Sequence, residues 1–112
     1  MSSLRVYIAG PYQSDPVGNT RTAVLTGREL VEQGFLPFIP HLSMLWDLIA
    51  PAQAEFYLRM DFGWIEMCDA VLRLPGDSPG ADAEVEYARE SDIPVFYSVG
   101  DLMDWADGRY HP

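Results

Sequence analysis

The sequence is short of cysteine and of long apolar runs. Its single cysteine, Cys68, excludes a disulfide within the 112-residue chain and favours a reducing, cytoplasmic location. No apolar run approaches the roughly 18 residues that a membrane-spanning helix needs. The N-terminal stretch MSSLRVYIAG has one basic residue and a short apolar run that stops at Gly10, which predicts a first strand and not a signal peptide.

Positive charge is also scarce. Seven Lys and Arg residues stand against 17 Asp and Glu residues, which gives a net charge of −10. Such a chain repels polyanions, so neither nucleic acid nor an anionic membrane surface is expected as a partner. A small anion remains possible where a helix N-terminus offers donors. Metal-binding motifs such as H-x-x-x-H or C-x-x-C are missing too, so no metal or other cofactor is expected.

The chain does have the material for one folded core. Apolar residues make up 48% of it and charged residues 21%, which is typical of a globular protein and not of a disordered one. A length of 112 residues suits a single domain, expected over 1–112.

Strand-like and helix-like segments alternate along this domain. The expected strands are 4–9, 35–39, 69–74 and 93–97, and the expected helices are 20–33, 53–67, 79–91 and a short one within 100–108. The segment 40–52 is expected as a long connection, and Pro37 places the second strand at a sheet edge.

This alternation predicts an α/β fold built from right-handed βαβ units. The expected architecture is a three-layer, flavodoxin- or Rossmann-like sandwich whose small, mostly parallel sheet of four or five strands is flanked by helices. Ligands of such sheets bind beyond the carboxyl ends of the strands. The candidate site therefore lies on the loops that begin at Gly10, Pro40 and Pro75.

One glutamate is directed toward the apolar face of its helix. On a helical wheel of residues 79–91, Glu84 falls beside Val85 and Ala88, whereas Glu86 falls in the polar arc and is expected in solvent. Burying a carboxylate is costly unless it is paired or functional. Glu84 is therefore either a boundary residue that reaches water or a loop, or a residue of a site.

The helix expected at 53–67 repeats the pattern. Asp61 lies at the centre of an apolar arc that includes Tyr57 and Trp64, and Phe62 lies on the opposite arc. Because two helices each direct one acid inward, a chance placement is a weaker explanation than it is for one helix. Paired carboxyls in a partly dry cleft are typical of sites that break a glycosidic bond.

The residues before Glu84 favour an anion site. Ser78 suits an N-cap, Pro79 suits the first helical position, and Gly80 lets a ligand approach the backbone closely. Free N–H groups at this end attract negative charge. The alternative is a capped helix with no ligand.

Three segments together resemble a known family. They are V-Y-I-A-G-P at 6–11, M-D-F-G-W-I-E-M-C-D-A-V-L at 60–72 and S-P-G-A-D-A-E at 78–84. In this order and spacing the chain resembles the nucleoside 2-deoxyribosyltransferase-like superfamily. It is most similar to the branch of nucleoside 5′-monophosphate N-glycosidases, from Arg5 to about Tyr97.

The resemblance implies roles for five residues. Glu84 corresponds to the nucleophile that forms a glycosyl-enzyme intermediate. Asp61 corresponds to an aspartate that handles the leaving base or positions the sugar, and Tyr7 to a tyrosine that orients the nucleophile. Ser78 and Gly80 correspond to the loop that holds the 5′-phosphate.

Further residues around this expected pocket are assigned with alternatives. Gly10 lets the sugar sit close to the end of the first strand. His41 approaches the pocket or is a structural loop histidine, and Arg21 is either a second phosphate contact or an exposed helix arginine. Pro11 and Tyr12 stand where relatives can carry more polar residues, which leaves base recognition open.

The function that the resemblance implies is hydrolysis of the N-glycosidic bond of a (deoxy)nucleoside 5′-monophosphate. The reaction passes through a covalent glycosyl-glutamate and releases free base and sugar 5-phosphate. Two alternatives are a 2-deoxyribosyltransferase that acts on free nucleosides and a nucleotide-binding module without turnover.

Aromatic residues are numerous for so small a monomer. They include Trp46, Trp64, Trp105, Tyr57 and Phe62, which lie on more than one face of the second helix. A homodimer or larger homo-oligomer with residues 53–67 at the interface is expected. The alternative is that the segment 40–52 covers them.

Overall fold

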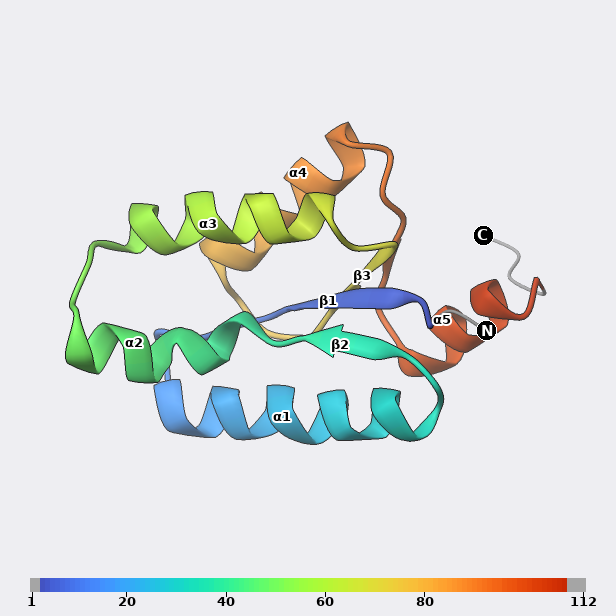
Figure 1. The fold of residues 1–112 in the computed structure, drawn as a ribbon, viewed down its shortest axis with the longest axis horizontal. Coiled ribbons are helices and arrows are strands. Elements are labelled where there is room, and N and C mark those ends of the chain that lie inside the picture. Colours follow the sequence, from blue (N-terminus) through green and yellow to red (C-terminus); the bar gives the residue numbers. More distant parts are fainter. Residues whose placement is uncertain (1–2, 109–112) are drawn as a thin grey trace.

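Four parallel strands in the order β2-β1-β3-β4 run through the centre of the molecule (Figure 1). The computed structural model describes residues 3–108, so the domain expected over 1–112 extends beyond them at both ends. The elements are β1 (Arg5–Ala9), α1 (Pro16–Glu32), β2 (Leu36–Phe38), the 3₁₀ turn η1 (Pro40–Ser43), α2 (Met44–Ile49), α3 (Ala54–Glu66), β3 (Ala70–Arg73), α4 (Pro79–Glu90), β4 (Val95–Phe96) and α5 (Val99–Ala106).

Helices cover both faces of this sheet, which gives the expected three-layer sandwich (Figure 1). Alternate residues of β1 supply the two cores because successive side chains of a strand point to opposite faces. Val6 and Ile8 pack with residues of α1 and α5. Tyr7 and Ala9 pack with residues of α3 and α4. The fold therefore directs Tyr7 toward the helix that carries Glu84.

The predicted strands are all present, and β2 is an edge strand as Pro37 indicated. Helix α1 begins four residues earlier than expected. Asp15 caps it by accepting a hydrogen bond from the Gly18 amide at 3.2 Å, and Pro16 occupies its first position.

The expected connection at 40–52 was wrong in part, because it contains η1 and α2. Helix α2 has six residues, none of them buried, and no side-chain N-cap. No buried apolar stripe therefore marks this helix, and Ser43 at its N-cap makes no side-chain capping hydrogen bond.

The predicted inward arc of α3 needs correction at two aromatic residues. Phe62, expected on the outer arc, stacks on Tyr87 of α4 with ring centroids 4.3 Å apart. Trp64, expected inward, stacks on Phe38 and remains 45% exposed. The reason is that α3 packs beside α4 as well as over the sheet, which rotates its buried face.

Two further aromatic side chains are partly covered. Trp105 packs against Phe96 of the core. Trp46 of α2 packs edge-on against Phe56 of α3 at 5.9 Å, yet both rings stay close to half exposed. No helix within residues 3–108 is both long enough and apolar enough to cross a membrane.

Candidate active site

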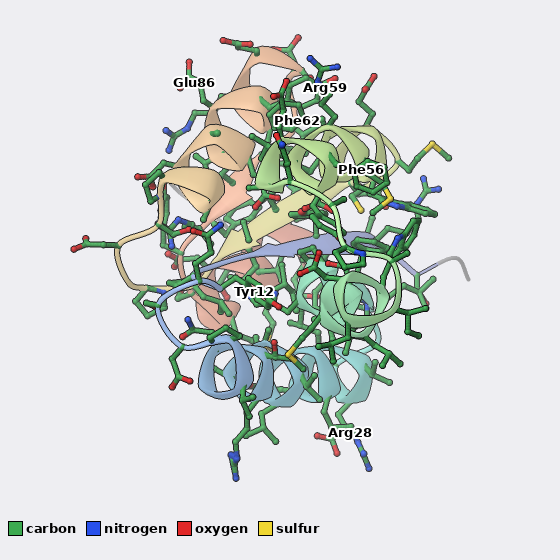
Figure 2. The ribbon with its side chains drawn as sticks, turned by 90° about the vertical axis from the view of Figure 1, so that its left-hand side faces the viewer. Tyr12, Arg28, Phe56, Arg59, Phe62 and Glu86 are labelled. Carbon is green, nitrogen blue, oxygen red and sulfur yellow. The ribbon has the colours of Figure 1, made fainter. Side chains whose placement is uncertain are left out.

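The loops at the carboxyl ends of β1, β2 and β3 surround a cavity of about 660 Å³. This volume lies in the range of small-molecule sites. Six of the residues predicted for the site line the cavity: Gly10, His41, Asp61, Ser78, Gly80 and Glu84. Figure 2 looks onto this edge of the sheet, with Tyr12 between the helical layers and Glu86 pointing outward.

Helix α4 places Glu84 at the cavity because its start is well defined. The Ser78 hydroxyl accepts a hydrogen bond from the Ala81 amide at 3.1 Å, and Pro79 is the first helical residue. About one and a half turns of helix then direct the Glu84 side chain inward, where it is 6% exposed, while Glu86 is exposed. The helical-wheel prediction for these two glutamates is confirmed.

Tyr7 supports the buried carboxylate from the sheet. Its side chain is fully buried in β1, and its hydroxyl donates a hydrogen bond of 2.5 Å to Glu84 Oε2. Burial and the neighbouring carboxylates raise the pKa of Tyr7 well above its ordinary value, so the phenol keeps its proton. The Tyr7 hydroxyl is therefore a fixed hydrogen-bond donor to one Glu84 oxygen, and the other oxygen remains for a ligand in the cavity.

Asp61 of α3 completes the acid pair. Burial raises the pKa of Asp61 to about 6 and the pKa of Glu84 to about 8, and the two carboxyls interact with each other. These values therefore belong to the pair and not to either side chain alone. Around neutral pH the pair holds one proton and one negative charge.

His41 lies across the cavity in η1 and is buried. Its Nε2 is 3.0 Å from the carbonyl oxygen of Pro11. Because a carbonyl only accepts, Nε2 carries the hydrogen, and burial lowers the pKa of His41, so the ring is neutral. Its Nδ1 is then a buried acceptor that has no hydrogen-bond partner among residues 3–108.

The glycines at the cavity have different physical roles. A Cβ on Gly80 would meet nothing within 4 Å, so the first turn of α4 is open to the cavity. A Cβ on Gly10 would lie 3.0 Å from the Leu74 Cβ, so close packing already requires that glycine. Gly76 has φ of +116° and lies against Pro11, which brings the β3–α4 loop onto the β1–α1 loop.

Arg21 is the predicted site residue that the structure does not bring to the cavity. Its side chain is exposed on α1, and it is not among the described residues that line the cavity. Of the two alternatives given for Arg21, the exposed helix arginine therefore matches its position. Tyr7 does not line the cavity either, but it reaches the cavity through its hydrogen bond to Glu84.

Several residues of the cavity were not predicted from the sequence. They are Gln13, Glu55, Tyr57 and Asp77, whereas Tyr12, which also lines the cavity, was already placed at the loop of base recognition by the resemblance. The spacing of Tyr57 and Asp61, four residues apart on one helix, was a usable signal, because residues four apart share a face. Within residues 3–108 no cluster of three or more His, Cys, Asp or Glu side chains forms a metal site.

Solved structures share this fold, among them a 2-deoxyribosyltransferase and a conserved protein. A 2-deoxyribosyltransferase from the psychrotolerant bacterium Bacillus psychrosaccharolyticus is 17% identical, with a TM-score of 0.62 over 96% of this chain and 92% of that one. A conserved protein from Enterococcus faecalis V583 is 18% identical, with a TM-score of 0.64 over 99% of this chain and 81% of that one. The chain therefore has the fold of the 2-deoxyribosyltransferases.

The sequence itself places the chain in a narrower group. A family model described as "Domain of unknown function (DUF7768)" matches residues 4–98, and the chain belongs to this family. No curated protein matches the sequence. The activity must therefore be argued from the cavity.

Proposed function

We propose that this protein hydrolyses the N-glycosidic bond of a nucleoside 5′-monophosphate through a covalent intermediate on Glu84. The observation that carries the proposal is the buried Glu84 carboxyl, which accepts a 2.5 Å hydrogen bond from Tyr7 and interacts with Asp61 in a cavity. The shared fold with a protein named as a 2-deoxyribosyltransferase supports the same chemistry.

The first step needs an ionised Glu84 and a protonated Asp61. Burial gives Glu84 the higher pKa of the two, so the resting proton lies on Glu84 and must pass to Asp61 before the attack. The hydrogen bond from Tyr7 favours the ionised form of Glu84 that results. The free Glu84 oxygen attacks C1′, so that a C–O bond forms while the C1′–N bond of the base breaks. Asp61, directly or through a water molecule, gives its proton to the departing nitrogen.

Water completes the reaction. Asp61, now ionised, takes a proton from a water molecule that attacks C1′, and the bond between C1′ and Glu84 breaks. The products are free base, sugar 5-phosphate and the original singly protonated pair. If a second base enters instead of water, the same intermediate gives transfer.

The 5′-phosphate is proposed to bind at the open N-terminus of α4. A Cβ on Gly80 would meet nothing within 4 Å there, and Ser78 immediately precedes the helix. A helix N-terminus carries roughly half a positive charge and favours anions.

A second candidate is transfer of deoxyribose between free nucleosides. It is favoured by the charge of the cavity: none of its described lining residues is Arg, whereas Glu55, Asp61, Asp77 and Glu84 all line it. A phosphate dianion meets repulsion from these acids that a neutral 5′-hydroxyl does not.

A chromatographic screen decides between these functions. Common nucleoside and deoxynucleoside monophosphates and the free nucleosides are incubated with the wild type, Glu84→Ala and the control Glu86→Ala. Release of base from a monophosphate by the wild type and the control, lost in Glu84→Ala, is the expected result. Turnover of nucleosides only when a second base is present would move the assignment to a transferase.

The screen also covers the non-catalytic alternative. If no compound turns over while a nucleotide raises the melting temperature, the protein is a binding module and Glu84 has no role as a nucleophile. A trapped glycosyl group on Glu84, detected by mass spectrometry of the intact protein, would exclude that reading.

We also propose that the protein forms a homodimer through α2 and α3. Apolar side chains on these helices are exposed, and Ile49 is 76% accessible. The exposed members are Leu45, Trp46, Leu48 and Ile49 of α2 and Phe56 and Trp64 of α3. An apolar surface of this kind is typical of a protein interface.

A further inference from the structure

The arginine at the end of β3 lies beneath the loop that leads to the candidate active site. Arg73 is the last residue of β3 and pairs in register with Ala9 of β1. Only 9% of its side chain is exposed. A buried guanidinium needs partners, because leaving the charge without them is costly.

Three acceptors surround this guanidinium. Arg73 donates hydrogen bonds to the carbonyl oxygen of Leu74, to that of Gly76 at 3.0 Å, and to the Asp82 carboxylate at 3.0 Å. The two carbonyls belong to the β3–α4 loop, and Asp82 belongs to the first turns of α4. One side chain thus ties the loop to the helix on either side of Ser78 and Gly80.

Arginine suits this position and lysine does not. The planar guanidinium has five N–H donors in a fixed fork, whereas an ammonium offers three donors around one atom. The fork matches carbonyls that lie two residues apart as well as a carboxylate. Losing it releases the loop that carries Gly76, whose backbone conformation favours glycine.

The charge of Arg73 is only partly neutralised by Asp82. The Asp82 side chain is 73% exposed, so water screens its interaction with the guanidinium. The titratable and charged groups that act on Glu84 are Tyr7 from β1, Asp61 from α3 and, through its charge alone, Arg73 from β3, and the neutral His41 lines the same cavity. Arg73 is the one cation in this set, and it lowers the pKa of Glu84.

We propose that Arg73 is a positioning residue of this site: its guanidinium holds the β3–α4 loop against α4 and supplies a buried positive charge to the site. The catalytic role of Arg73 rests on the proposed function. The two structural effects of Arg73, on the position of the loop and on the ionisation of Glu84, are measurable without a substrate.

The first measurement is a carboxyl ¹³C NMR titration of Glu84 in the free protein. Arg73→Met should raise the Glu84 pKa, because a cation that lowers it is removed. Arg73→Lys keeps the charge and should leave this pKa close to the wild-type value. Arg89→Met is the matched control, since Arg89 is exposed on α4 and donates to the Tyr97 hydroxyl at 2.7 Å.

The second measurement is a titration with inorganic phosphate, followed by the amide shift of Gly80. Arg73→Lys should weaken phosphate binding by about tenfold, since the loop loses its hydrogen-bonded fork, worth roughly 1–2 kcal/mol. Arg89→Lys should bind as the wild type does. If Arg73→Met does not fold, the neutral variant Arg73→Gln takes its place in the first measurement.

The results decide the role of Arg73 in either direction. An unchanged Glu84 pKa in the neutral variant, or wild-type phosphate binding by Arg73→Lys, overturns the proposal. Failure of the wild type to cleave any nucleoside or nucleotide would refute the proposed function alone, because neither titration depends on turnover.

Discussion

Replacing Glu84 by glutamine should stabilise the protein, and more so as the pH rises. The fold raises the pKa of Glu84 from the ordinary glutamate value of 4.5 to about 8, mainly because burial disfavours the charged form. Between these two values the native state binds more protons than the unfolded state. The free energy of unfolding therefore falls as the pH rises from about 4.5 to about 8. Glutamine keeps the shape and accepts the Tyr7 hydrogen bond, but it does not ionise.

The size of the effect follows from the same two values. At about 1.4 kcal/mol per pH unit, the raised pKa of Glu84 lowers the stability by about 3 kcal/mol at pH 7 and by on the order of 5 kcal/mol above pH 8. The interaction with Asp61 makes these figures upper bounds for Glu84 alone. For a domain of this size the gain at pH 8 corresponds to a melting temperature higher by on the order of 10 °C.

Urea denaturation at pH 5 and at pH 8 measures the difference directly. Glu84→Gln should exceed the wild type by several kcal/mol at pH 8 and by much less at pH 5. The matched control is Glu86→Gln, an exposed change on the same helix, for which the difference should stay within about 0.5 kcal/mol at both pH values. A stability gain for Glu84→Gln that is equal at the two pH values would refute the account of a buried, ionising carboxylate.

Four further expectations concern the acid pair, His41 and the exposed helices. Activity should follow a bell-shaped pH profile, rising as the pH passes about 6 and falling as it passes about 8, because the reactive pair carries one proton; a profile flat over this range contradicts that assignment. Tyr7→Phe should reduce kcat by about 10- to 100-fold and raise the Glu84 pKa, since a charged acceptor loses its donor; NMR titration and steady-state kinetics measure both. His41→Phe should raise KM by about tenfold with little change in kcat, because it removes the buried acceptor Nδ1, which we expect to bind a substrate hydroxyl or N–H. An unchanged KM would make His41 a structural residue. Ile49→Glu should convert a dimer into a monomer in light scattering, with Glu29→Ala on the outer side of α1 as the control.

Local signals account for the parts of the fold and site that were predictable. The order of strands and helices follows from apolar periodicity and from turn residues such as Gly34. Helix α4 has a complete local signature, because Ser78 caps it, Pro79 starts it and the apolar stripe fixes its buried face. The inward position of Glu84 therefore needed no tertiary information.

Other features depend on contacts between distant segments. Of the two alternatives for Arg21, the phosphate contact depended on a helix that begins at residue 20. The cap at Asp15 adds a turn before it and leaves Arg21 exposed on the helix. The contacts of Arg73 with Leu74 and Gly76 arise from the path of a loop, which no periodic pattern encodes. Likewise the faces of Phe62 and Trp64 are decided by α4 and β2.

Burial of the acid pair links stability, protonation and the choice of substrate. A dry environment makes Glu84 and Asp61 weaker acids, which lowers the stability of the folded chain at neutral pH. The same environment stores one proton between the two carboxyls, and a departing base needs that proton. It also leaves the pair with one negative charge in place of two, which reduces the repulsion that a 5′-phosphate meets in a cavity with no described arginine lining. A site built from two exposed carboxylates would have neither the shared proton nor the reduced charge. Burial of the acid pair is therefore the common cause of the loss of stability and of the proposed activity.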